Sequence, residues 1–212
     1  MNAERLAEDV PSRHRGPYRK GLVRRAQIVR AASETFAEHG YAGGSIRTIA
    51  ARVGVSPATL LQYFGSKEEL LEAVLEDWDN RSDPAGYTRA RGLAHVDQQL
   101  RGVMTFHVEH RGLIELFLTM AAEATNLDHP ARPFIQRRYA HTLGELVKAF
   151  HEAIADGEIA PMSDEQIDEE ARLVFAVMDG IELQWLLDPS VDLVGLFNHH
   201  LDATIERWRG RA

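Results

Sequence analysis

The sequence contains no cysteine among its 212 residues, which excludes disulfide bonds and thiolate metal ligands and agrees with a reducing compartment. It also lacks any run of about 18 apolar residues, the length that a membrane-spanning helix requires. The most apolar stretch, residues 113–122, is short and interrupted by Glu115, so it predicts a buried helix. The N-terminus has no apolar core of the signal-peptide kind. We therefore expect a cytoplasmic protein that does not enter a membrane.

Signatures of catalysis are also missing from the sequence. It contains no glycine-rich phosphate loop, nucleophile elbow or nucleophilic cysteine, so we expect neither an enzyme nor a bound cofactor. Among the ten histidines, only His107 and His110 are spaced to share one face of a helix. Because zinc sites require three or four converging ligands, no metal site is predicted.

The positive charge of the chain is concentrated near its N-terminus. The net charge is −8, yet residues 11–67 hold ten Lys or Arg and only two acidic residues, which gives this segment a charge of +8. Residues 68–212 hold 13 basic and 27 acidic residues, a charge of −14. This division favours a basic module that meets an anion and an acidic body that does not. Charge alone also allows a second interpretation, in which the gradient of charge along the chain is simply exposed to solvent and binds no partner.

Helical periodicity dominates the rest of the chain, and no strand pattern occurs. Residues 1–18 have no periodic apolar face and predict a flexible basic arm. Serine caps and glycine stops then predict three helices within residues 19–66, and a fourth begins after Ser66. Five more helices are expected near residues 89–110, 112–126, 131–156, 164–187 and 191–209. The prediction is an all-α fold of about nine helices, with an N-terminal helix-turn-helix domain at 19–66 and a helical C-terminal domain at 67–212.

Residues 45–64 have the pattern of a helix-turn-helix. Ala50 is small where the two helices touch, Gly54 allows the turn, and Leu60 faces inward. The outer face of the second helix is then free to enter a major groove, which admits one helix. Hydroxyls, helix N-termini and a cation around this face suit phosphates. The predicted groove-facing residues are Pro57, Ala58, Thr59, Leu61 and Gln62, and the predicted phosphate contacts are Ser45, Ser56, Tyr63 and Lys67.

About 50 consecutive residues resemble the opening of TetR-type transcriptional regulators in residue type and in spacing. The resemblance rests on segments 25–32, 36–41, 45–50, 54–60 and 63–71. It implies an all-helical homodimer with an N-terminal DNA-binding domain and a C-terminal ligand-binding and dimerisation domain. Most family members repress transcription and release DNA when a small molecule binds. The resemblance also implies that Arg47 reads a base. The family commonly has a tyrosine where this chain has Leu61, which cannot donate a hydrogen bond to a phosphate.

The resemblance further implies a pocket for an unidentified small-molecule effector in the helices after residue 88. Large or polar side chains that could line this pocket are Trp78, Phe106, His107, Phe117, Met120, Glu123, Tyr139 and Leu143. Aromatic and methionine stripes at this spacing are often plain core. Each of these residues could therefore equally pack in the interior.

Two apolar stripes near the C-terminus predict a dimer interface. Residues 178–189 resemble the penultimate helix of a TetR subgroup in which the last two helices of each subunit form a four-helix interface. Wide apolar stripes at the end of a chain need a partner, although they could also face the core of their own subunit. The predicted interface residues are Phe175, Met178, Trp185, Phe197, Leu201 and Trp208.

Together, these patterns predict a ligand-responsive repressor that binds a palindromic operator of double-stranded DNA as a homodimer. The alternatives are a helical protein-interaction module and, less favoured, an enzyme on a helical scaffold. Steep salt dependence of duplex binding would favour the regulator, whereas steady turnover of a substrate would favour the enzyme.

Overall fold

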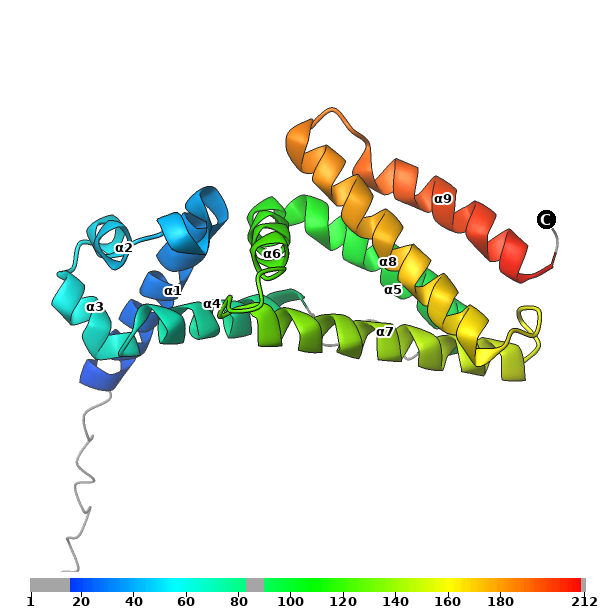
Figure 1. Cartoon of the computed structure of the whole chain (residues 1–212), viewed down its shortest axis with the longest axis horizontal. Coiled ribbons are helices and arrows are strands. Elements are labelled where there is room, and N and C mark those ends of the chain that lie inside the picture. Colours follow the sequence, from blue (N-terminus) through cyan, green and yellow to red (C-terminus); the bar gives the residue numbers. More distant parts are fainter. Residues whose placement is uncertain (1–15, 83–89, 211–212) are drawn as a thin grey trace, which may run out of the picture.

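A computed structural model describes residues 16–82 and 90–210, and within these ranges the chain forms nine helices and no strand. At one end lie α1 (Gly16–Gly43), α2 (Ile46–Val53) and α3 (Pro57–Phe64), and α4 (Lys67–Ser82) leads from them into the body of the molecule (Figure 1). The body consists of α5 (Gly92–Glu109), α6 (Arg111–Glu123), α7 (Arg132–Ala155), α8 (Asp164–Leu187) and α9 (Leu193–Trp208). The predicted all-α fold is confirmed. In the part of the chain that is described, no helix is long and apolar enough to cross a membrane.

Local sequence signals set the ends of α2 and α3. The hydroxyls of Ser45 and Ser56 accept hydrogen bonds from the backbone N–H groups of Thr48 and Thr59, at 3.1 and 3.0 Å, and so cap the two helices. Gly54 ends α2 with φ 67°, a left-handed conformation that glycine adopts without strain. Three residues therefore separate α2 from α3, which holds the two helices as a tight corner.

The apolar interior forms two clusters. The first joins α1–α4 to α6 and the start of α7, and it includes Phe36, Leu71 and Met120. The second joins α5, α7, α8 and α9, and it includes Phe150 and Phe197. Because the first cluster crosses the predicted domain boundary at residue 66, the N-terminal helices share a core with α6.

Helix α1 differs from its prediction at both ends. It begins at Gly16, inside the predicted arm, because Pro17 is tolerated in the first turn of a helix. It extends to Gly43, but Gly40 (φ 68°) leaves the helical region, so the last residues form a turn of their own. The remainder of the predicted arm, residues 1–15, lies outside the described residues.

Candidate nucleic-acid interface and effector pocket

The corner of α2 and α3 turns the outer face of α3 toward solvent. Leu60 and Phe64 are buried beneath it in the first apolar cluster. All ten residues predicted to contact DNA lie at this end of the molecule, on α2, α3, their caps or the first residue of α4 (Figure 1). Ser45, Arg47, Ser56, Pro57, Ala58, Leu61, Gln62 and Tyr63 are exposed, whereas Thr59 and Lys67 are half-buried.

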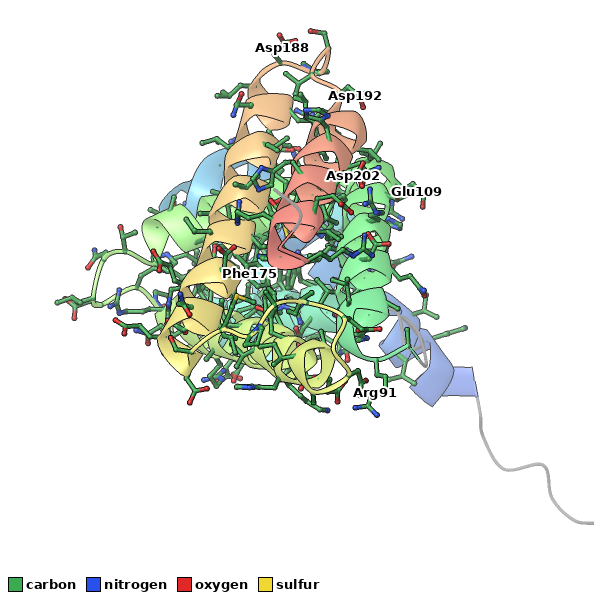
Figure 2. The ribbon with its side chains drawn as sticks, turned by 90° about the vertical axis from the view of Figure 1, so that its right-hand side faces the viewer. Arg91, Glu109, Phe175, Asp188, Asp192 and Asp202 are labelled. Carbon is green, nitrogen blue, oxygen red and sulfur yellow. The ribbon has the colours of Figure 1, made fainter. Side chains whose placement is uncertain are left out.

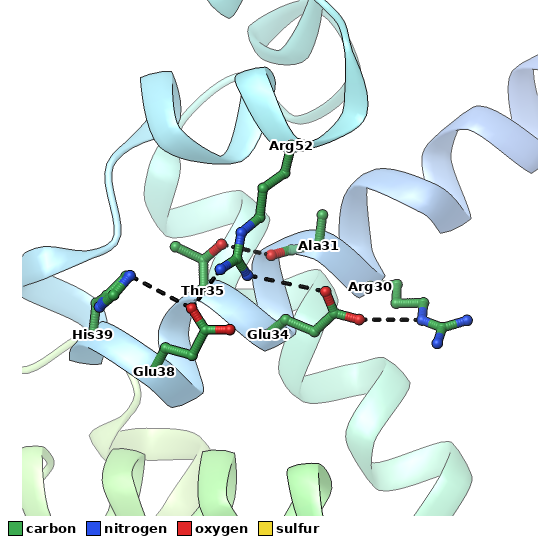
Figure 3. A network of polar contacts seen from close by, with 7 residues as sticks. All are labelled: Arg30, Ala31, Glu34, Thr35, Glu38, His39 and Arg52. Carbon is green, nitrogen blue, oxygen red and sulfur yellow. Dashed lines mark hydrogen bonds and ion pairs between the residues drawn. The ribbon is translucent and has the colours of Figure 1, made fainter.

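Two arginines of the basic segment are held by the protein itself. Arg52 on α2 forms ion pairs with Glu38 and Glu34 on α1 (Figure 3), and its hydrogen bond to Glu38 holds the pKa of that carboxyl below its usual range. Arg24 donates a hydrogen bond to the backbone carbonyl of Val53 at 3.1 Å. These contacts hold α2 against α1. Arg47 differs, because its exposed side chain has no hydrogen bond or ion pair within the described residues.

Lys67, the predicted phosphate contact on α4, packs against a tyrosine. Its Nζ lies 4.3 Å from the centroid of the Tyr41 ring and donates a hydrogen bond to the backbone carbonyl of Ala42 at 3.5 Å. Desolvation lowers the pKa of Lys67 and raises the pKa of Tyr41. Sequence reasoning assigned no role to Tyr41, although it belongs to the segments that resemble the TetR family.

A cavity of about 120 Å³ lies in the body of the molecule, between side chains of α4, α5, α6, α7 and α8. This volume holds about four water molecules, or one small organic ligand. Trp78, Phe117 and Tyr139 line it with aromatic rings, and the Trp78 and Phe117 rings stack with centroids 4.7 Å apart. Together with His107, these are four of the eight residues predicted to line a pocket.

Two carboxylates on α8 line the same cavity. Glu182 is 2% exposed, and its Oε1 lies 2.5 Å from Nδ1 of His107. Asp179 accepts a hydrogen bond from the Tyr139 hydroxyl at 2.5 Å, and burial raises the pKa of Asp179 to about 6. Sequence reasoning missed both carboxylates. The available signal was their spacing, which places them on the same stripe of α8 as Phe175, another residue of the cavity wall.

Two family models match most of the chain. Residues 28–74 match the model described as "Bacterial regulatory proteins, tetR family", and residues 93–208 match the model of the C-terminal part of BetI-type transcriptional repressors. The chain belongs to the TetR family. It is therefore a DNA-binding transcriptional regulator and not an enzyme, which confirms the predicted class over the enzyme and the interaction module.

Relatives of this TetR-family regulator are similar over most of its length. The transcriptional regulator UidR of Escherichia coli strain K12 is 28% identical over 138 residues, which are 65% of this chain and 69% of UidR. The structure of Salmonella enterica GusR is 26% identical, with a TM-score of 0.68, and the match covers 89% of this chain and 96% of GusR. A regulator from Saccharomonospora viridis, solved in complex with choline, shares the fold with a TM-score of 0.70 at 22% identity, and the match covers 87% of this chain and 96% of that one.

Four residues predicted to line the effector pocket lie elsewhere in this TetR-family chain. Leu143 lines a second hollow between α6, α7 and α8. Met120 is fully buried in the first apolar cluster, and Phe106 packs against that cluster. The carboxylate of Glu123 turns to the end of α1, where it accepts a hydrogen bond from the Tyr41 N–H. The side of α6 that carries Met120 and Glu123 thus faces α1, a neighbour that helical periodicity does not identify.

The side chains predicted to form the dimer interface belong to the core of the single subunit, which corrects that prediction. Met178, Trp185, Phe197, Leu201 and Trp208 are all at most 8% exposed, and Phe175 is half-buried in the cavity wall. The apolar stripes of α8 and α9 pack against α5 and α7, which cover the inner sides of both helices. The two helices lie side by side (Figure 2), and their exposed leucines are Leu173, Leu183, Leu187 and Leu196.

Proposed function

We propose that this regulator is a repressor that binds a palindromic operator as a homodimer and releases it when a small molecule occupies the cavity. The observation that carries the DNA-binding half is the exposed outer face of α3 beside the unpaired Arg47. Two copies related by a two-fold axis present two α3 helices to half-sites about 34–36 Å apart. A dimer bound across a promoter blocks transcription.

The dimer forms through the outward sides of α8 and α9. Leu173, Leu183 and Leu187 occupy one stripe of α8, Leu196 is exposed on α9, and each is about half exposed or more. Gly180 on the same stripe adds no side chain, and the space where its Cβ would lie is open, so two α8 helices can approach closely. Exposed leucines on one side of a helix are a common feature of protein interaction surfaces.

The effector is a small organic cation. Asp179 and Glu182 bring two carboxylates to a cavity that is also lined by Trp78, Phe117 and Tyr139. Carboxylates attract a cation through charge, and the Trp78 ring already holds one cation, the Arg138 guanidinium, which also lines the cavity and is paired with Asp79. The related regulator from Saccharomonospora viridis was solved with choline, a quaternary ammonium compound, which supports this ligand class.

Selection of bound duplexes from a random DNA pool tests the DNA-binding half. The proposal expects an inverted repeat whose half-sites lie about one helical turn apart, or a multiple of it. A promoter that carries the selected site should lose transcription when the protein is added in vitro. A non-repeated site would contradict the dimer on a palindrome, and activation of the promoter would contradict repression.

A pair of compounds that differ in charge tests the effector half. Choline and its uncharged isostere 3,3-dimethyl-1-butanol are titrated calorimetrically into the protein, and the release of the selected duplex is then measured with each. Choline is expected to bind at least about tenfold more tightly, because only the cation gains from the two carboxylates. Asp179→Asn should reduce this preference, whereas Asp128→Asn, on an exposed loop, should not. Equal binding of the two compounds would contradict the cationic class.

A further inference from the structure

The carboxylate of Glu123 on α6 holds the end of α1. Its Oε2 accepts a hydrogen bond from the Tyr41 backbone N–H at 2.8 Å and lies 3.2 Å from Nε2 of His129. The other ring nitrogen of His129 accepts a hydrogen bond from the Ala131 N–H at 3.2 Å, so the proton of the neutral ring is on the nitrogen that faces Glu123. Glu123 therefore accepts a hydrogen bond from Tyr41 and lies within ion-pair distance of the His129 ring, which makes no hydrogen bond through this nitrogen within the described part of the chain.

Gly40 makes this approach of Glu123 possible. Its φ of 68° interrupts α1, so the N–H of Tyr41 lies beyond the regular helix and needs a partner outside it. A Cβ at position 40 would clash with Oε1 of Glu123, so any other side chain there would displace the carboxylate. The glycine thus supplies both the backbone conformation and the space that the carboxylate requires.

Tyr41 connects Glu123 to the start of α4. The Tyr41 hydroxyl donates a hydrogen bond to Oε1 of Glu68 at 2.9 Å, and the face of its ring carries the ammonium group of Lys67. The ring also packs against Phe36, with centroids 5.7 Å apart. The side chain of Tyr41 therefore contacts the first two residues of α4, one of which is the predicted phosphate contact Lys67.

We propose that Glu123 is a positioning residue for DNA binding, which acts through Tyr41 to hold the Lys67 ammonium group where it meets a DNA phosphate. This inference rests on the proposed contact between Lys67 and the DNA backbone. Glu123 itself lies on α6, one helix away from the recognition corner. A residue that acts only through Lys67 loses its effect on DNA binding once Lys67 is removed.

A double-mutant cycle on a mixed-sequence duplex tests this chain of contacts. The affinities of wild type, Glu123→Ala, Lys67→Ala and the double variant are measured by fluorescence anisotropy at several salt concentrations. Loss of one phosphate contact lowers the slope of log affinity against log salt by about 0.9, so a dimer that loses the contact in both subunits loses about 1.8. Each single variant is expected to lose this amount, and the double variant is expected to bind as Lys67→Ala does.

Two further variants make the result specific. Glu115→Ala removes a glutamate from the same helix that has no contact with Tyr41, so it should keep the wild-type slope. If circular dichroism shows that Glu123→Ala is unfolded, Tyr41→Leu takes its place in the cycle, because it removes the ring under Lys67. The positioning role would be overturned if the double variant lost the sum of the two single losses in affinity. It would also be overturned if Glu123→Ala, or Tyr41→Leu where that variant replaces it, kept the wild-type slope. A wild-type protein with no salt-dependent duplex binding would instead overturn the DNA contact on which the inference rests.

Discussion

The proposed dimer face can be separated from the subunit core by two substitutions that sequence periodicity alone would treat alike. Leu183 on α8 is 52% exposed in the single subunit, whereas Phe197 on α9 is 0% exposed. Leu183→Glu is expected to break the dimer and leave the subunit folded. Phe197→Ala is expected to destabilise the subunit itself.

The burial of each residue gives the size of these effects. Full burial of a leucine contributes about 1.5–3 kcal/mol, so the exposed half of Leu183 contributes about 1 kcal/mol per copy and about 2 kcal/mol per symmetric dimer. Its loss weakens dimerisation about 30-fold, and a buried unpaired carboxylate weakens it further. Truncation of a buried phenylalanine to alanine costs about 3–5 kcal/mol of folding free energy, which lowers the melting temperature by roughly 6–20 °C in a chain of this size.

Sedimentation velocity and thermal circular dichroism measure the two effects on the same samples. Leu127→Glu is the matched control, because Leu127 is 77% exposed but follows α6, away from α8 and α9. The control should remain a dimer with the wild-type melting temperature. A dimeric Leu183→Glu would remove the outward side of α8 from the interface. An unchanged melting temperature for Phe197→Ala would refute the assignment of that ring to the core.

Two other predictions concern the DNA interface and the cavity. Arg47→Ala should weaken operator binding by about 1–3 kcal/mol and leave thermal unfolding unchanged, whereas Arg52→Ala should lower the melting temperature because it breaks ion pairs between α2 and α1. Fluorescence anisotropy measures the DNA affinity of both variants, and circular dichroism measures their melting temperatures. The same change in affinity and melting temperature for both variants would contradict the roles assigned to Arg47 and Arg52. Burial raises the pKa of Asp179 from 3.8 to about 6, so the folded chain binds this proton more tightly than the unfolded chain. The stabilisation is complete below pH 3.8 and is lost as the pH rises through about 6. The unfolding free energy of wild type minus that of Asp179→Asn should therefore fall across this pH range in urea titrations, and a constant difference would argue against the raised pKa.

The parts of the fold that the sequence predicts well are those set by local chemistry. A serine before a helix and a glycine after it act on backbone groups within a few residues, so Ser45, Gly54 and Ser56 predict the ends of α2 and α3 almost to the residue. The recognition face follows directly, since helical spacing fixes which side of α3 is opposite Leu60. The structure adds that Arg52 is engaged by α1 whereas Arg47 is not, a distinction that depends on contacts between helices.

Predictions that require knowledge of the neighbouring helix were less successful. An apolar stripe predicts burial, and Phe197 and Trp208 are indeed buried, but the stripe does not reveal whether the cover belongs to the same chain or to a second copy. Glu123 illustrates the same limit for polar residues. The sequence left open whether it lines a pocket or packs in the interior, yet the group that it binds is a backbone N–H, 82 positions away in the sequence and released by the break at Gly40.

Helix α6 gives the proposed effector response a physical route to the DNA interface. At its start, the Arg111 guanidinium donates a hydrogen bond of 2.7 Å to the carbonyl of Leu186, near the end of the helix that carries both cavity carboxylates. At its far end, Glu123 holds the backbone of Tyr41 and through it the start of α4. In the proposed response, a ligand that repositions α8 moves α6 through the Arg111 contact, and with it the carboxylate of Glu123 relative to α1. A ligand can shift this equilibrium only by its differential affinity for the two arrangements. If the proposed function holds, release of DNA requires a cation that fits the cavity better when Glu123 and Tyr41 are displaced from each other than when they are in contact.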